Sequence, residues 1–415
     1  MPMRMRTLLA ATAALAAAML ACGCGGDYKR RTAAAREAFY AGDFEAAAGH
    51  YSSGAETEGK TQILYLMERG LVRRAAGDHA GSNADLLDAD RLAEKMYFNK
   101  AAVAAATILF DERAAPYPGE DHELVLLSTY VALNFLALGD LEHAQIEARR
   151  IDDRLRALEH FRKRPYKQNA FARYLSGVIY ERSGEIEEAY IDYKIVHELA
   201  PGFPPAREPL VRLSRALGFK DQHRRWRKEF PEVGTEATHE AQAQVVVFFE
   251  NGRSPEKVSH DEVSDIPIFV RRPSAYAGAA LEVGGRRLAR THVLEDIEAT
   301  AIRNLKERTG PLIAKALARF AVKEGIAYGV GEAADDKNVA NLARIILHLS
   351  DKADLRSWLT LPKELQIARA WVPAGQRPVV VRFLAPDGGG GEATDFGTVD
   401  LAPGKLHVLM ARTLR

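Results

Sequence analysis

The side chains of this sequence that most directly indicate a chemical role are the thiols of its cysteines. The chain contains two cysteines, Cys22 and Cys24, and both lie close to the N-terminus. A cysteine sulfur is a nucleophile, so either thiol is a candidate for acylation. If one is acylated, the other has no partner for an intrachain disulfide. The rest of the chain contains no cysteine, which suits a compartment in which free thiols would be oxidised.

The residues in front of Cys22 have the pattern of a signal peptide. Arg4 and Arg6 give a short basic start, and the run over residues 8–21 carries no charge. This run has the length of the apolar region of a secretory signal peptide. It falls short of the about 20 apolar residues that a membrane-spanning helix needs. We therefore predict that residues 1–21 are a signal peptide.

The residues around the cysteine resemble the lipobox of bacterial lipoproteins, in which small residues precede a cysteine whose thiol is diacylated before cleavage. Ala21 stands directly before Cys22, whereas Met19 occupies the position where that family usually has leucine. The resemblance implies lipidation of Cys22, with Cys24 as the alternative.

After cleavage, residues 22–27 would form a lipidated tether to a membrane. Gly23 follows the anchor and is not aspartate. By resemblance to the lipoproteins of Gram-negative bacteria, this residue favours export to the periplasmic face of the outer membrane. The expected location is therefore the cell envelope.

Four turn motifs divide the following residues into helix pairs. Each motif is a glycine followed by an acidic residue between two apolar stretches, and the four glycines are Gly42, Gly77, Gly139 and Gly184. The first two are 35 residues apart, close to the ~34-residue tetratricopeptide period. The later spacings of 62 and 45 residues indicate insertions between repeats.

The residues around these glycines resemble the tetratricopeptide repeat. Small residues stand five positions after each glycine and seven positions before it, where the two helices of a repeat cross closely. Besides the glycines, the positions that define the resemblance are Ala47, Tyr51, Ala144, Gly177, Ala189, Tyr193 and Pro201. The resemblance implies a solenoid of stacked helix pairs over residues 28–230, whose concave groove takes an envelope protein or peptide.

After residue 240 the pattern changes to extended segments with glycine and proline turns. Apolar and β-branched runs predict strands over residues 244–250, 266–270, 276–283, 368–372, 378–383, 396–401 and 405–411. The predicted fold class is therefore α + β, with a tetratricopeptide-like α-solenoid followed by a small β-sandwich-like domain with inserted helices over residues 240–415.

The insertion over residues 291–349 is predicted to be helical. Thr291 is a candidate N-cap for a helix over residues 292–308, and Thr309-Gly310-Pro311 is expected to break it. Further helices are predicted over residues 312–324 and 338–348.

A second resemblance involves the C-terminal half. Motifs that contain Asp354, Arg356, Trp358 and Arg369 look like the signature of a family of proteobacterial repeat lipoproteins without an assigned activity. The resemblance implies a location in the cell envelope. Alternation along an extended segment places the first three of these side chains on one face, and Arg369 is a candidate to join them. Such a cluster either binds a partner or packs two domains together.

Composition and motifs argue against several other functions. The formal net charge of +1 lacks the basic excess of a protein that binds nucleic acid. No histidine pair or cysteine cluster has the spacing of metal ligands, and no nucleophile motif or complete phosphate-binding motif is present. We therefore expect no metal and no cofactor.

These observations predict a non-enzymatic scaffold lipoprotein that binds protein partners through its repeats, in the assembly of the envelope or of peptidoglycan. One alternative is a glycan- or small-ligand-binding module in the C-terminal domain that stacks its ligand on Trp358 and Trp371. Another is a peptidoglycan-acting enzyme in which Glu295 or Asp296 meets Asp354 in a cleft.

Overall fold

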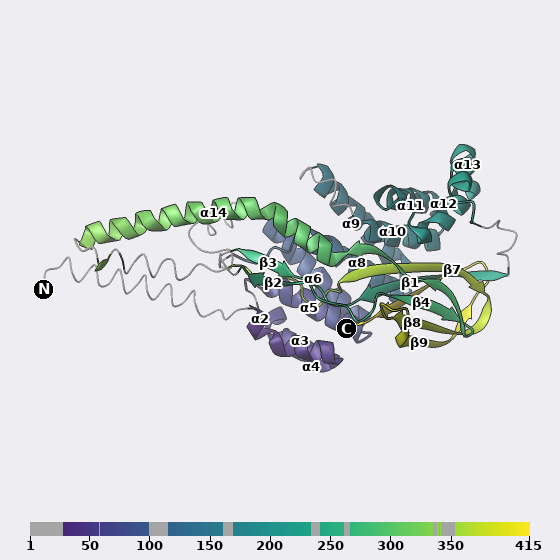
Figure 1. The fold of residues 1–415 in the computed structure, drawn as a ribbon, viewed down its shortest axis with the longest axis horizontal. Helices are drawn as coiled ribbons and strands as arrows, with labels where there is room; N and C mark the ends of the chain where they lie inside the picture. Colours follow the sequence, from purple (N-terminus) through teal and green to yellow (C-terminus); the bar gives the residue numbers. More distant parts are fainter. Residues whose placement is uncertain are drawn as a thin grey trace.

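The computed structural model describes residues 28–57, 59–98, 115–160, 169–233, 241–260, 266–334, 338–339, 341 and 353–415. The predicted signal peptide, Cys22, Cys24 and most of the helix predicted over residues 338–348 lie outside these ranges. The described residues form an N-terminal half of helix pairs and a C-terminal half that contains the β-sheets (Figure 1).

The N-terminal half is a series of helices that pack against their neighbours in sequence. These helices are α2 (Tyr28–Arg31), α3 (Ala33–Ala41), α4 (Phe44–Glu56), α5 (Gln62–Ala75), α6 (His79–Phe98), α8 (Asp121–Leu138), α9 (Leu141–His160), α10 (Ala170–Ser183), α11 (Ile186–Leu199), α12 (Pro204–Ala216) and α13 (Lys220–Glu229). Helices α3 and α4, α5 and α6, α8 and α9, and α10 and α11 form successive pairs. The prediction of tetratricopeptide-like helical repeats in the N-terminal half is confirmed.

Glycines in the left-handed conformation reverse the chain inside each pair. The four turn glycines have φ between 75° and 85°. A residue without a Cβ adopts this conformation at little cost, and its N–H bonds back to the last turn of the helix. The N–H of Gly42, for example, donates to the carbonyl of Phe39 at 3.1 Å. Asp43 then caps the second helix by accepting a hydrogen bond from the N–H of Ala46.

Small residues allow the two helices of a pair to approach closely. A Cβ on Gly70 of α5 would lie 2.7 Å from the side chain of Leu86 of α6. A Cβ on Gly177 of α10 would lie 3.0 Å from the ring of Tyr193 of α11. The other predicted repeat positions Ala47, Tyr51, Ala144 and Ala189 are fully buried, and Pro201 follows the end of α11.

The C-terminal half contains three sheets. Its strands are β1 (Gln242–Asn251), β2 (Glu256–Ser259), β3 (Pro267–Val270), β4 (Gly278–Val283), β5 (Arg286–Arg290), β6 (His292–Asp296), β7 (Glu364–Pro373), β8 (Gly375–Leu384), β9 (Gly390–Leu401) and β10 (Leu406–Arg412). The first sheet has the order β10-β1-β7-β6, the second has the order β5-β4-β8-β9, and β2 pairs with β3. Strand β10 runs parallel to β1, whereas β7 runs antiparallel to it.

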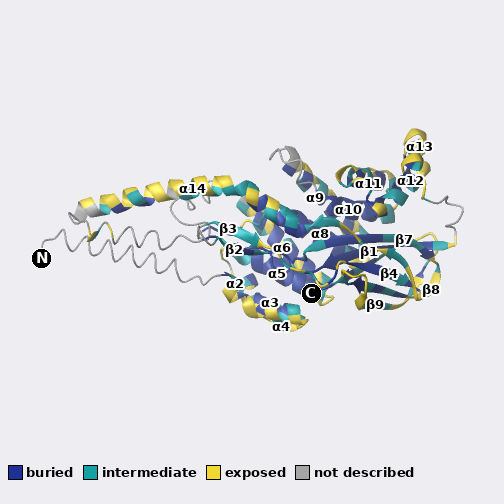
Figure 2. Ribbon diagram, viewed as in Figure 1, coloured by how far each residue is buried: buried dark blue, intermediate teal, exposed yellow. Residues whose placement is uncertain are grey.

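The central strand β1 of the first sheet is buried on both faces. Along β1, Val245, Val247 and Phe249 belong to a core shared with the second sheet, whereas Val246 and Phe248 belong to the core of the helices. Because side chains alternate along a strand, one strand thus contributes to two cores. The molecule has three layers, which are the helix pairs, the first sheet and the second sheet. Figure 2 shows β1 as one of the most deeply buried elements.

The inserted region differs from the prediction in two places. Residues 292–296 form strand β6 because they pair with β7, and the N-cap of the helix is Asp296 rather than Thr291. Helix α14 (Ile297–Ala334) then continues through Gly310 and Pro311. A proline inside a helix costs roughly 3 kcal/mol, which the helical turns on both sides outweigh here. Within the described residues, no helix is long and apolar enough to cross a membrane.

The close crossing of α5 and α6 gives a test of the repeat packing. Gly70→Ala would place a methyl group against the fully buried Leu86, so we expect it to lower the free energy of unfolding by about 1–3 kcal/mol. Gly49→Ala, in α4, is the control because a Cβ there meets nothing within 4 Å. It should raise the free energy of unfolding by up to about 1 kcal/mol. Urea denaturation measures the free energy of unfolding of both variants. If both substitutions stabilised the protein, the close approach of α5 and α6 at Gly70 would be contradicted.

Candidate functional site

The inner face of the helix pairs, formed by α5, α8 and α10, is the candidate binding site, and the chain's own C-terminal half covers it. Phe171 of α10 meets Phe248 of β1 edge to face, with 5.5 Å between the ring centroids. Tyr130 of α8 meets Trp358 in the same manner at 5.9 Å. The first sheet thus already supplies apolar surface that this inner face buries, and a protein or peptide partner bound to the repeats stays a prediction.

Residues 353–363 run across this face as an irregular segment that two buried carboxylates hold by its backbone. Glu123 of α8 accepts the N–H of Trp358 at 2.8 Å. Glu68 of α5 accepts the N–H groups of Leu359 at 2.8 Å and of Thr360 at 2.9 Å. Hydrogen bonds to an ionised acceptor are stronger than neutral ones, and main-chain donors do not depend on the side chains of the segment. The inner face thus holds a stretch of its own chain by the contacts that a bound peptide would make.

The two carboxylates lie in a strongly desolvated environment. Burial raises the pKa of Glu68 to about 6, and the hydrogen bonds from Thr360 and Leu359 offset part of this effect. Burial is also the main cause that raises the pKa of Glu123, followed by the charge of Glu120. Desolvation favours the protonated form of a carboxyl group. Ionised Glu68 therefore accepts strong hydrogen bonds, but the folded state is less stable with Glu68 ionised than with Glu68 protonated.

The predicted cluster of Asp354, Arg356 and Trp358 lies in the same interface. Arg356 pairs with Asp354 through two hydrogen bonds, of 2.8 Å and 2.7 Å, and donates to the carbonyl of Ala115 at 3.0 Å. Burial alone would raise the pKa of Asp354, but the arginine lowers it overall. Trp358 is 1% exposed and donates its indole N–H to Thr360 at 3.1 Å. These side chains fill the space between the two halves of the molecule.

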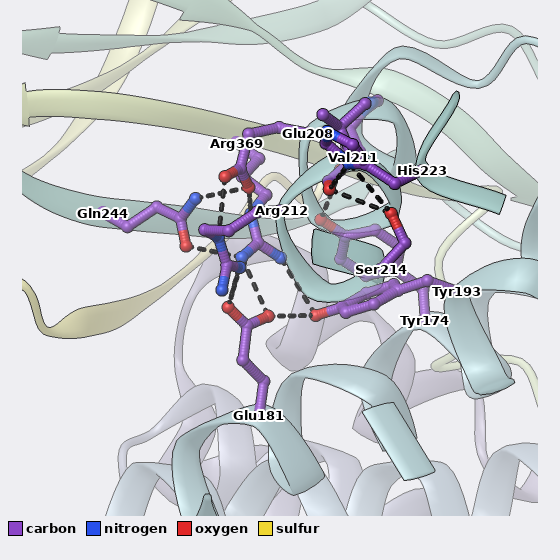
Figure 3. Close-up of polar contacts among 11 residues, drawn as sticks. Tyr174, Glu181, Tyr193, Glu208, Val211, Arg212, Ser214, His223, Gln244 and Arg369 are labelled. Carbon is purple, nitrogen blue, oxygen red and sulfur yellow. Dashed lines mark hydrogen bonds and ion pairs between the residues drawn. The ribbon is translucent and has the colours of Figure 1, made fainter. Parts of the chain in front are cut away.

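Arg369 lies on β7 at the centre of a separate network (Figure 3). Its guanidinium donates to both carboxylate oxygens of Glu181 at 2.7 Å and 2.8 Å, to the hydroxyl of Tyr193 at 2.9 Å and to Gln244. The side chain of Arg369 is only 2% exposed. Burial alone would raise the pKa of Glu181, but Arg369 and then Arg212 lower it to about 2. The network is therefore a buried ion pair with hydrogen bonds around it.

A third network joins α5 to the first sheet. Arg74 contacts Glu250 of β1 at 3.2 Å and donates to Asn134 at 2.6 Å. Arg412 of β10 donates to the other oxygen of Glu250 at 3.0 Å, and the hydroxyl of Tyr130 lies 3.3 Å from it. The carboxylate of Glu250 thus has partners from both halves of the chain.

Sequence analysis did not identify Arg74 and Glu181, although a signal for them exists. Each stands three residues before a turn glycine, Gly77 and Gly184 respectively, at the same position of two different repeats. A charged residue at a position that faces a core requires a partner of opposite charge. The partners, Glu250 and Arg369, are likewise charged residues inside strands that are otherwise mostly apolar.

The arrangement does not favour the enzyme alternative. Glu295 accepts a hydrogen bond from Thr300 at 2.6 Å, and burial raises its pKa to about 7. Asp296 caps α14 and Asp354 pairs with Arg356, so each of these carboxylates is engaged locally. Among the described residues, no group of three or more histidine, cysteine, aspartate or glutamate residues could hold a metal ion.

The geometry does not favour the glycan-binding alternative either. Trp358 is buried between the two halves, and Trp371 lines a cavity beside Arg369 with a volume of about 40 Å³. A cavity of this size has room for ordered water. Small-molecule sites typically measure about 300–1,000 Å³.

Comparison with known proteins yields structural likenesses only. No family model and no curated protein matches the sequence. The crystal structure of MamA is similar at 15% identity and a TM-score of 0.33, over 48% of this chain and 92% of that one. A tetratricopeptide repeat protein from Parabacteroides merdae is similar at 16% identity and a TM-score of 0.33, over 50% of this chain and 68% of that one. At these TM-scores the likenesses carry no argument, and the repeat assignment rests on the helix pairs described above.

The network around Arg369 predicts a large effect of a single substitution. Arg369→Met would leave Glu181 buried without its main partner, and we expect a loss of about 3–5 kcal/mol in the free energy of unfolding. Adding Glu181→Met should restore part of the loss, because the second charge is then also absent. Arg224→Met removes an exposed ion pair with Asp221 and should change stability by less than about 0.5 kcal/mol. Equal effects of the two arginine substitutions in urea denaturation would refute the assignment.

The raised pKa of Glu68 predicts a specific pH dependence. Between its ordinary pKa of 4.5 and its folded value of about 6, the folded state binds more protons than the unfolded state. This group therefore makes stability decrease as the pH rises through that window. Relative to Glu68→Gln, the wild type should lose about 2 kcal/mol of stability between pH 4 and pH 7. Denaturation of both proteins at several pH values tests this, and a constant difference would be inconsistent with the raised pKa.

Proposed function

We propose that this chain is a non-enzymatic, lipid-anchored scaffold of the cell envelope, held by Cys22 on the periplasmic face of the outer membrane. Its helix pairs pack against its first sheet, and together they serve the assembly of the envelope or of peptidoglycan. The observation that carries the proposal is the covered inner face, because it leaves the outer side of the repeats as the surface for protein partners.

Two exposed isoleucines mark that outer side. Ile146 on α9 is 45% exposed and Ile191 on α11 is 50% exposed. Each stands seven residues after a turn glycine, so the two occupy the same position of successive repeats. Equivalent positions of stacked repeats lie on the same side of a solenoid. An apolar helix or loop of another envelope protein would cover both side chains on binding.

Photo-crosslinking from single positions tests this surface. A benzophenone amino acid is placed at position 146 or 191 of the full chain in its native host. We expect the same partner protein to be crosslinked from both positions and identified by mass spectrometry. Ala84 is the matched control, because it is exposed at the same repeat position of the second pair but offers no large apolar side chain.

The result at the control position decides the interpretation. A partner captured from positions 146 and 191 but not from position 84 would support the outer surface as the binding site. No captured protein at 146 and 191, or equal capture at all three positions, would count against it.

A further inference from the structure

The outer helices α9 and α11 carry the same row of side chains. Counted from the turn glycine of each pair, positions 3, 7, 10 and 14 hold an acid, an isoleucine, a base and an acid. The two rows are Glu142, Ile146, Arg149 and Asp153 on α9, and Glu187, Ile191, Lys194 and Glu198 on α11. At 3.6 residues per turn, these four positions fall within about 60° around the helix axis and extend about 16 Å along it. Each row is therefore one narrow strip of its helix.

Both rows lie on the side of the helix that faces away from the rest of the fold. Seven of the eight residues are exposed, and Lys194 is partly exposed. The residues that α9 buries, such as Ala148 and Ile151, lie on the opposite side of that helix. Helix α10 packs against both α9 and α11, so the two rows belong to neighbouring parts of one surface.

The packing of the repeats does not require the two isoleucines. The first two helix pairs have Gly49 and Ala84 at the same position, and both residues are exposed there. Those helices form and pack without a large apolar side chain at this place. A binding surface explains why the third and fourth pairs present one to solvent, each within a border of charged groups.

The charges that border the isoleucines leave an excess of acid. Each row has two acids and one base, and the ammonium of Lys194 already lies 3.9 Å from a carboxylate of its own row. The acid one turn before each isoleucine, Glu142 or Glu187, stands near the N-terminal end of its helix. Gln145 of α9 donates to Glu185 of α11 at 2.7 Å, so these two helix ends meet. Both acids therefore lie at the same end of the surface, where a positively charged group of a partner would be favourable.

We propose that the partner of this surface is an amphipathic helix whose apolar side covers Ile146 and Ile191 and whose lysine or arginine side chains face Glu142 and Glu187. This inference rests on the proposed function and names the chemistry of its partner. A helix suits the surface because it presents an apolar strip with charged residues along its edges, as the two rows do. The apolar centre contributes most of the affinity, whereas the charged border fixes the orientation and excludes acidic partners.

Charge reversal in a crosslinking chain tests the proposal. The full chain carries a benzophenone amino acid at position 146, in its native host, with Glu187→Lys in the neighbouring row. We expect the yield of the captured partner to fall at least fivefold. Glu45→Lys is the matched control, because Glu45 is exposed at the same repeat position in a row without isoleucine. It should leave the yield within twofold, and unchanged thermal melting of both variants shows that the fold is retained.

The segment of the partner that is crosslinked gives a second readout. Mass spectrometry should find a lysine or arginine within four residues of the crosslinked position. Changing that cation to glutamate should restore the yield in the Glu187→Lys chain at least threefold.

The outcomes separate this inference from the proposed function. An unchanged yield with Glu187→Lys, or a crosslinked segment without a basic residue, would overturn the basic helix as the partner. The captured protein would then still support the outer surface as a binding site. If the unaltered surface captures no protein at all, the proposed binding surface and this inference both fail.

Discussion

Buried charges on the inner face of the helix pairs are the constraint on which the rest of the structure depends. Arg74, Glu68, Glu123 and Glu181 lie on the helices, and residues of the C-terminal half supply their partners. A buried charge without a partner destabilises a protein by several kcal/mol. Without the C-terminal half these four groups would face solvent, so packing the two halves together buries them and requires that each finds its partners. The charges therefore make the packing of the two halves specific, although the sequence pattern separates the halves clearly.

The same charges fix the register between the layers. Along β1, Gln244 and Glu250 bracket Val246 and Phe248, and all four lie on the side toward the helices. A shift of one residue would turn this side toward the second sheet and would bury Glu250 in an apolar core. Apolar contacts supply most of the stabilisation, but they tolerate small displacements. The ion pairs of Arg74 and Arg369 can form in only one alignment of the first sheet against the helices.

Local patterns in the sequence predict the helix pairs, because a turn glycine and a small crossing residue act within about 35 residues. They do not predict β6, whose residues 292–296 are extended only because β7 lies beside them. They also do not identify the partners of the buried charges, since Arg369 and Glu181 are 188 residues apart. The uninterrupted apolar run of β1 did contain a hint. A strand of this kind is buried on both faces, which requires a further layer to cover it.

The energetics of the covered face determine how this repeat region can recognise other proteins. A groove that exchanges its occupant needs an open state that is populated to at least a small fraction. Six large side chains of the C-terminal half are buried against the helices, namely Val246, Phe248, Trp358, Leu361, Leu365 and Ile367. At roughly 1.5–3 kcal/mol for each, exposing them would cost at least about 9 kcal/mol. Such an open state would be populated less than about once in a million molecules. The proposed binding of a partner protein therefore has to use surfaces that are already exposed, such as the outer side of α9 and α11.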